Sequence, residues 1–117
     1  MFKKLYLKFK YIKGENMSNL KIEKKYNKFL YCDTYYIYNG NYYLEIGNKD
    51  NLKLLFHLIL DYQSGKINNK SNNFFKLNYN PKFFYITYKV SGRSLGILKE
   101  DVDKLCLLLH TEVINNK

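Results

Sequence analysis

The chain has 117 residues, a formal net charge of +10, 46% hydrophobic and 18% aromatic residues, and a single proline. This length allows one domain with one modest core and leaves no room for a second catalytic domain. The apolar content excludes an intrinsically disordered chain, and no apolar run approaches the roughly 18 residues that a membrane-spanning helix needs.

Residues 1–16 hold five lysines and one glutamate, and so contribute +4 to the net charge. One back-translation of 13–17 places a bacterial ribosome-binding sequence a few nucleotides before the codon of Met17. Lysines interrupt the apolar residues of this segment, and no cleavage site follows, so it is not a typical signal peptide. We therefore expect residues 1–16 to be a disordered or misassigned leader and residues 17–117 to form a single α+β domain.

Two segments that follow have the pattern of strands. Residues 20–26 alternate loosely and predict an edge strand guarded by lysines. Residues 34–46 predict a hairpin, because Asn39-Gly40 is a dipeptide favoured in type I′ turns and would pair Tyr38 with Asn41. The period of two assigns Tyr35, Ile37, Tyr42, Leu44 and Ile46 to the core face, and Thr34, Tyr36, Tyr38, Tyr43 and Glu45 to the opposite face.

Helical spacing of apolar residues predicts helices over 48–66 and 98–114. Between them, residues 74–90 predict a second hairpin interrupted at Asn80-Pro81, and residues 92–97 predict a turn with a short last strand. The order is therefore (β)ββ–α–ββ(β)–α. Strand pairs that alternate with helices favour an α+β two-layer sandwich, with an antiparallel sheet of four to six strands and two helices on one face.

Residues able to carry catalysis are few. His57 and His110 fall within the predicted helices with no partner at a readable spacing, and Cys106 falls on a buried helical stripe. No Walker A, HExxH or GxSxG motif occurs. Cys32 and Cys106 form no disulfide or metal-binding pattern, which is typical of reduced thiols in a cytoplasmic protein. We therefore expect a non-enzyme without a metal or cofactor.

The most informative surface is the sheet face that the helices would leave open. We expect its binding residues to be Tyr36, Tyr38, Tyr43, Lys76, Phe83, Tyr85 and Lys89. Aromatic rings among lysines form a stacking platform for single-stranded nucleic acid. Tyrosine is also enriched in the hot spots of protein interfaces, including those of homodimers. A third interpretation is purely structural, because cross-strand tyrosine pairs stabilise a sheet by themselves.

The turn at 91–96 is a second, weaker candidate for a binding site. Gly92, Arg93 and Ser94 supply backbone N–H groups, the chain's only guanidinium and a hydroxyl ahead of a predicted helix, which is a suitable place for a small anion. The acidic residues Glu100 and Asp101 at the start of that helix would repel the same anion. An ordinary tight turn also explains the glycine.

The abundance of Lys, Asn, Tyr, Phe and Ile fits AT-rich coding DNA and favours an origin in a low-GC bacterium, a phage or a mobile element. We predict a small non-enzymatic protein that binds a host protein or nucleoprotein complex, as an anti-CRISPR-like inhibitor of host defence would. The alternatives are a single-stranded DNA- or RNA-binding module that uses the Tyr/Lys face, and an immunity protein or antitoxin that neutralises a toxin. A basic protein suits each of these partners, and no membrane partner is expected.

Overall fold

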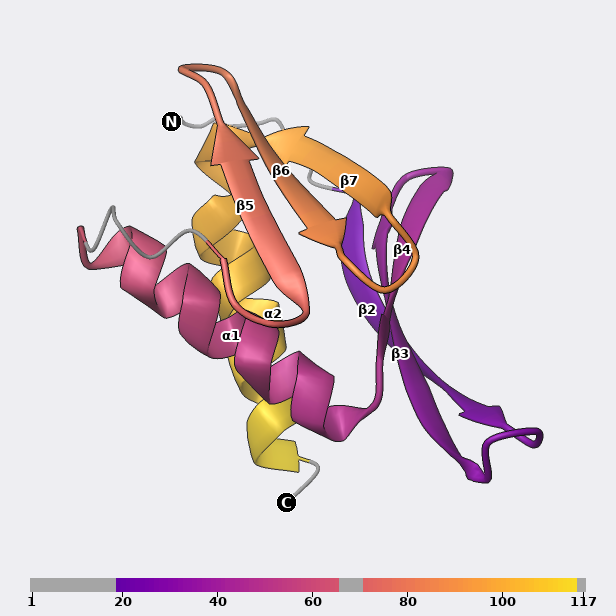
Figure 1. The fold of residues 1–117 in the computed structure, drawn as a ribbon. Coiled ribbons are helices and arrows are strands. Elements are labelled where there is room, and N and C mark those ends of the chain that lie inside the picture. The colour runs from indigo at the N-terminus through magenta and orange to yellow at the C-terminus, as the bar shows by residue number, and fades with distance from the viewer. Residues whose placement is uncertain (1–18, 66–70, 116–117) are drawn as a thin grey trace.

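The computed structural model describes residues 19–65 and 71–115. Its elements are β2 (Leu20–Asn27), β3 (Cys32–Asn39), β4 (Tyr42–Gly47), α1 (Lys49–Gln63), β5 (Phe75–Tyr79), β6 (Phe83–Tyr88), β7 (Arg93–Leu98), a 3-10 turn (Lys99–Asp101) and α2 (Val102–Asn115) (Figure 1). The α+β class and the predicted element order are confirmed, with both optional strands present. The expectation for residues 1–16 lies outside the described residues.

The six strands form two antiparallel sheets of three strands each, in the orders β2-β3-β4 and β5-β6-β7. Each sheet is a meander of consecutive strands, and α1 separates the two meanders in the chain. Edge strands β4 and β7 approach each other without forming a main-chain ladder (Figure 1). The sequence predicted one sheet, and the structure has two that are joined by side chains.

The first hairpin differs from its predicted register. Asn39 pairs with Tyr42, whereas the sequence predicted Tyr38 opposite Asn41. Gly40 is therefore the first central residue of the turn. Its φ is +63°, whereas that of Asn41 is not positive, so the turn is of type II′ and not of the predicted type I′. The partners of Tyr36, Ile37 and Tyr38 move by two positions, so their predicted faces are retained, and an irregularity between Tyr35 and Tyr36 shifts the partner of Tyr35 by three. Tyr42 is the exception among the predicted core residues, because it lies beside the turn and is 76% exposed instead of joining the core.

The inner faces of both sheets and both helices share one core. The first sheet contributes Tyr35, Ile37, Leu44 and Ile46, as predicted, and α2 contributes Cys106 among its buried residues. The ring of Tyr62 on α1 reaches the second sheet, where its centroid lies 4.8 Å from that of Tyr79 and 5.0 Å from that of Phe84. Full burial of an apolar side chain such as Leu44 or Ile46 stabilises the fold by about 1.5–3 kcal/mol.

The helix predicted over 48–66 begins at Lys49, whereas the helix predicted over 98–114 begins only at Val102. Asn48 caps α1, because its Oδ1 atom accepts the backbone N–H of Asn51 at 3.1 Å. A 3-10 turn that contains Glu100 and Asp101 leads into α2. With 15 and 14 residues, neither helix of the described chain is long and apolar enough to cross a bilayer.

Candidate binding surface

The outer face of the first sheet carries a tyrosine cluster, defined as Tyr36, Tyr38 and Tyr43. The centroid of the Tyr36 ring lies 6.4 Å from that of Tyr38 and 6.1 Å from that of Tyr43, and the Tyr38–Tyr43 distance is 5.6 Å. Tyr36 and Tyr38 alternate along β3, and Tyr43 lies directly opposite Tyr38 on β4. The strand period of two therefore places all three rings on one side. Tyr43 is 54% exposed, so the cluster is open to solvent.

Charged residues of β2 border the tyrosine cluster. The Lys25 ammonium donates a hydrogen bond to the Tyr38 hydroxyl at 2.9 Å and lies 5.1 Å from the centroid of the Tyr36 ring. The Lys21 ammonium lies 5.2 Å from the centroid of the Tyr38 ring and 2.9 Å from a carboxylate oxygen of Glu23. Sequence reasoning did not assign these residues to the site. Lys21 and Lys25 alternate along the predicted edge strand and therefore share one of its faces. Pairing that strand with β3 would have placed this face beside the tyrosines.

The charged and tyrosine side chains at this border shift one another's pKa values. The hydrogen bond to Tyr38 is the main cause that raises the pKa of Lys25, and the hydrogen bond from Lys21 lowers the pKa of Glu23. Burial, followed by the charge of Glu45, raises the pKa of Tyr36. The two lysines are balanced by Glu23 and Glu45 on the same face. The tyrosine cluster therefore offers aromatic area and hydroxyls on a nearly neutral background.

The other predicted face residues lie on the second sheet. Phe83 and Tyr85 project from the outer side of β6 with their ring centroids 6.2 Å apart, and Lys76 is exposed on the same side of β5. Lys89 follows β6, and its ammonium donates to the carbonyl of Asn72 at 2.7 Å. The structure therefore places the predicted residues in two groups, one on each sheet.

The predicted anion site is an internally bonded turn. Gly92 donates its backbone N–H to the carbonyl of Tyr88 at 2.8 Å, and Arg93 donates its own to the Ser91 hydroxyl at 3.2 Å. The Ser94 hydroxyl shares a 2.6 Å hydrogen bond with a threonine of β6. Strand β7 follows this turn, so the helix N-terminus that the sequence placed directly after it lies further along the chain.

The β2–β3 hairpin ends in an apolar tip, defined as Phe29, Leu30 and Tyr31. These side chains are 85%, 64% and 82% exposed. The Oδ1 atom of Asn27 accepts the backbone N–H groups of Phe29 at 2.9 Å and Leu30 at 3.1 Å, which orders the loop. A shallow hollow of about 300 Å³ connects the tip with the tyrosine cluster, and it is lined by Lys25, Tyr26, Asn27, Lys28, Phe29 and Tyr36.

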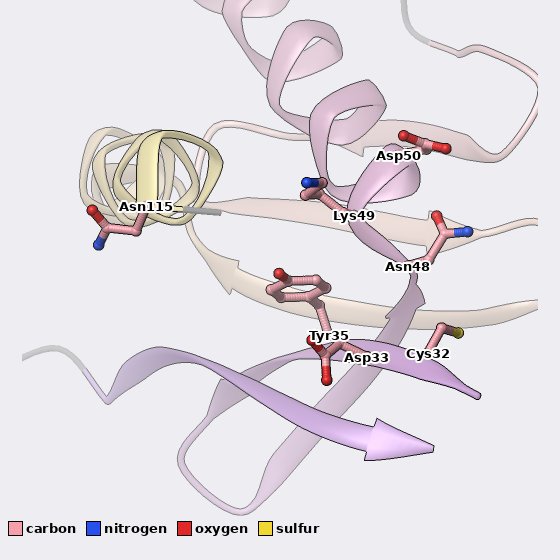
Figure 2. Close-up of a pocket in the computed structure, with 7 residues that line it drawn as sticks. All are labelled: Cys32, Asp33, Tyr35, Asn48, Lys49, Asp50 and Asn115. Carbon is pink, nitrogen blue, oxygen red and sulfur yellow. The ribbon is translucent and has the colours of Figure 1, made fainter. Parts of the chain in front are cut away.

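A polar pocket of about 450 Å³ lies where the start of β3 faces the first turn of α1 and the end of α2 (Figure 2). It is lined by Cys32, Asp33, Tyr35, Asn48, Lys49, Asp50 and Asn115. The ring of Tyr35 extends from β3 toward the helices, and burial raises the pKa of its hydroxyl (Figure 2). The lining contains no histidine, the most frequent general base, and Asn48 is already engaged in capping α1.

A further open hollow of about 540 Å³ lies between α1 and α2, and it is lined by Phe56, Leu60, Gln63, Asp103, Cys106, Leu107 and His110. Within 19–65 and 71–115, His, Cys, Asp and Glu side chains form no group of three or more that could hold a metal ion. Both the tyrosine cluster and the apolar tip belong to the first sheet, and the hollow beside Tyr36 links them. Comparison with known proteins gives no match, whether to protein-family models, to curated proteins or to solved structures.

Proposed function

We propose that this chain is a non-enzymatic binding protein that contacts another protein through the tyrosine cluster. The proposal is carried by three tyrosine rings with centroids within 6.4 Å of their neighbours on an open sheet face. Tyrosine presents a large, rigid surface with a terminal hydroxyl and loses little conformational entropy on binding, which is why it dominates many interface hot spots.

The charges around the cluster favour a protein over a nucleic acid. Two lysines and two glutamates share the face, and Glu23 pairs with Lys21 at 2.9 Å. Affinity for nucleic acid depends on lysines and arginines that neutralise phosphates. Here Lys25 already donates to Tyr38, and the carboxylates would repel phosphates. A protein partner can instead match this mixed pattern of charges.

A protein of this kind acts by forming a stoichiometric complex with its partner and so blocking the partner's surface. Its richness in Lys, Asn, Tyr, Phe and Ile fits the AT-rich coding DNA of a low-GC bacterium, a phage or a mobile element, and an inhibitor that blocks a host defence complex needs only an interaction surface. An immunity protein or antitoxin would use the same face against a toxin. In either role, the tyrosine cluster would form the centre of the contact and the charged residues of β2 its rim.

The test combines one double variant with a matched control. Tyr36→Ala combined with Tyr43→Ala removes two of the three rings, whereas Tyr42→Ala removes an exposed neighbour of opposite orientation. A partner is first captured from host lysate with the wild-type protein and purified, and its affinity is then measured by calorimetry. We expect the double variant to lose at least about tenfold in affinity, as hot-spot truncation does, and Tyr42→Ala to retain it.

Two outcomes would contradict this proposal. One is equal affinity of the double variant and the wild-type protein, with circular dichroism confirming that both are folded. The other is recovery of the bare protein from every candidate host lysate. Retention of the complex at high salt would support a contact dominated by tyrosine area, because ion pairs at exposed surfaces are screened.

A second candidate function, single-stranded nucleic-acid binding, is favoured by the charge of the second sheet. Residues 71–98 contain four basic residues and no acidic residue. Phe83, Tyr85 and Lys76 share the outer face there. We expect any binding of a random oligonucleotide to fall steeply with added salt and to weaken on Tyr85→Ala but not on Tyr43→Ala. Fluorescence anisotropy with a labelled oligonucleotide measures both effects.

A further inference from the structure

We propose that the apolar tip of the β2–β3 hairpin inserts into the headgroup region of an anionic lipid membrane as a reversible peripheral anchor. This inference goes beyond the protein contact proposed above and does not depend on it. The sequence predicted no membrane partner, and the exposed tip is the observation that changes this expectation. The anchor is a loop, so it requires no membrane-spanning helix.

The first support is the exposure and position of the tip. Phe29 and Leu30 have no polar atom in their side chains, yet they are 85% and 64% exposed. They lie at the end of a two-stranded ribbon that projects from the body of the protein, at the lower right of Figure 1. Apolar side chains that follow one another at a convex end can enter a deformable lipid interface, whereas a protein partner would need a concave pocket of matching shape.

The second support is that the loop is preorganised. Asn27 accepts two backbone N–H groups of the tip, at 2.9 Å and 3.1 Å. Tyr31 has a φ of +55°, a left-handed conformation that is uncommon for an aromatic residue. A loop that is already ordered loses little conformational entropy when its side chains insert.

The third support is the chemistry around the tip. Lys24 and Lys28 lie on the same hairpin, whereas Lys25 is held by the Tyr38 hydroxyl and by Glu23 further from the tip. Lysines next to an apolar insertion reach the phosphates of anionic headgroups, and tyrosines such as Tyr26 favour the membrane–water interface. A nucleic acid would use the same lysines, but it would leave the aliphatic side chain of Leu30 without a partner.

The chain contains no tryptophan, so Phe29→Trp creates a single fluorescent reporter at the tip. The variant is titrated with vesicles of phosphatidylglycerol and phosphatidylcholine in equal parts, and separately with vesicles of phosphatidylcholine alone. We expect a blue shift and protection from iodide quenching with the anionic vesicles only. Leu107→Trp is the matched control, because Leu107 is 64% exposed on α2, outside the tip, and its emission should not change.

Co-sedimentation of the unmodified protein with the same anionic vesicles provides a second measurement that no variant can disturb. Phe29→Ser combined with Leu30→Ser should reduce the bound fraction at least tenfold, and Val90→Ser combined with Leu107→Ser should leave it unchanged. Failure of the unmodified protein to sediment, or an equal blue shift at Leu107→Trp, overturns the proposal. A blue shift of Phe29→Trp with a random oligonucleotide but not with vesicles would assign the tip to nucleic acid instead.

Discussion

At the scale of single residues, the left-handed conformation of Gly47 turns the chain from the end of β4 toward the start of α1. Its φ is +89°, and a Cβ atom there would lie against the Asn51 amide nitrogen and 2.9 Å from the Tyr88 hydroxyl. These two groups share a 3.0 Å hydrogen bond. Gly47→Ala therefore strains the backbone and disturbs this pair, and we expect it to lower the free energy of unfolding by about 2–4 kcal/mol.

Gly92→Ala is the control for this prediction. Gly92 has a φ of +74°, but no atom lies within 4 Å of an added Cβ, so only the backbone term of about 1–2 kcal/mol applies. Urea denaturation of both variants separates conformational strain from side-chain collision. Equal losses of stability would show that the contacts with Asn51 and Tyr88 relax without cost.

A second residue-scale prediction concerns Asp101, in the 3-10 turn before α2. Burial raises the pKa of its carboxyl, Glu100 raises it further, and Lys104 opposes the shift. The folded protein therefore holds this proton more tightly than the unfolded chain, whose aspartate pKa is about 3.9. The contribution of this group is fully present below that pH and is lost as the pH rises through the folded pKa.

Asp101→Asn removes this titration. We expect the difference in stability between variant and wild-type protein to shift in favour of the variant as the pH rises above about 4. Urea midpoints measured across this pH range give the difference directly. Glu100→Gln should lower the pKa of Asp101 in an NMR titration, because it removes one of the two causes that raise it. A stability difference that does not change with pH would show that Asp101 has the same pKa in both states.

At the scale of elements, a side chain joins the two sheets. The amide nitrogen of Asn39, at the end of β3, donates to the carbonyl of Gly96 on β7 at 2.9 Å in a partly buried position. We expect Asn39→Ala to lower the free energy of unfolding by about 1–3 kcal/mol, because it leaves that carbonyl without this donor. Asn78→Ala, at an exposed position of β5, is the matched control in the same denaturation experiment. Equal stability of the two variants would contradict a structural role for the link.

Element types were predictable because local patterns specify them. The helical spacing around Leu55 and Ile59 and the alternation around Ile37 and Leu44 both appear as burial in the structure. The register of the first hairpin was not predictable from its dipeptide, because a turn centred on Gly40 and Asn41 also gives glycine its positive φ. The division into two sheets depends on long-range contacts between β4 and β7, which no local pattern contains.

The candidate site, like the fold, was predictable from the sequence only where local patterns specify it. Tyr36, Tyr38 and Tyr43 were found because their face follows from the period of two alone. Lys21 and Lys25 were missed, since their place beside the rings depends on the pairing of β2 with β3. The apolar tip was missed for a different reason. It lies in a loop without periodicity, whose conformation is set by hydrogen bonds to the Asn27 side chain.

At the scale of the whole molecule, the charge of the residues that the structure describes separates by layer. The strand segments 19–47 and 71–98 together carry eight basic and three acidic residues, whereas the helical segments 48–65 and 99–115 carry four basic and six acidic residues. Among the described residues, this distribution makes the strand side the more favourable face for a polyanion. The net charge of the chain alone would not give this preference.

Two triple variants with the same net charge test this orientation. One replaces Lys76, Lys82 and Lys89 of the strand side with glutamate, and the other replaces Lys49, Lys53 and Lys104 of the helical side. If net charge alone governed the attraction, both would elute from a heparin column at the same salt concentration. We expect the strand-side variant to elute earlier, because its substitutions remove cations that face the polyanion, whereas the helical lysines stand among carboxylates that already weaken their field. The opposite order would place the polyanion-binding side on the helices, and circular dichroism of both variants confirms that the comparison is between folded proteins.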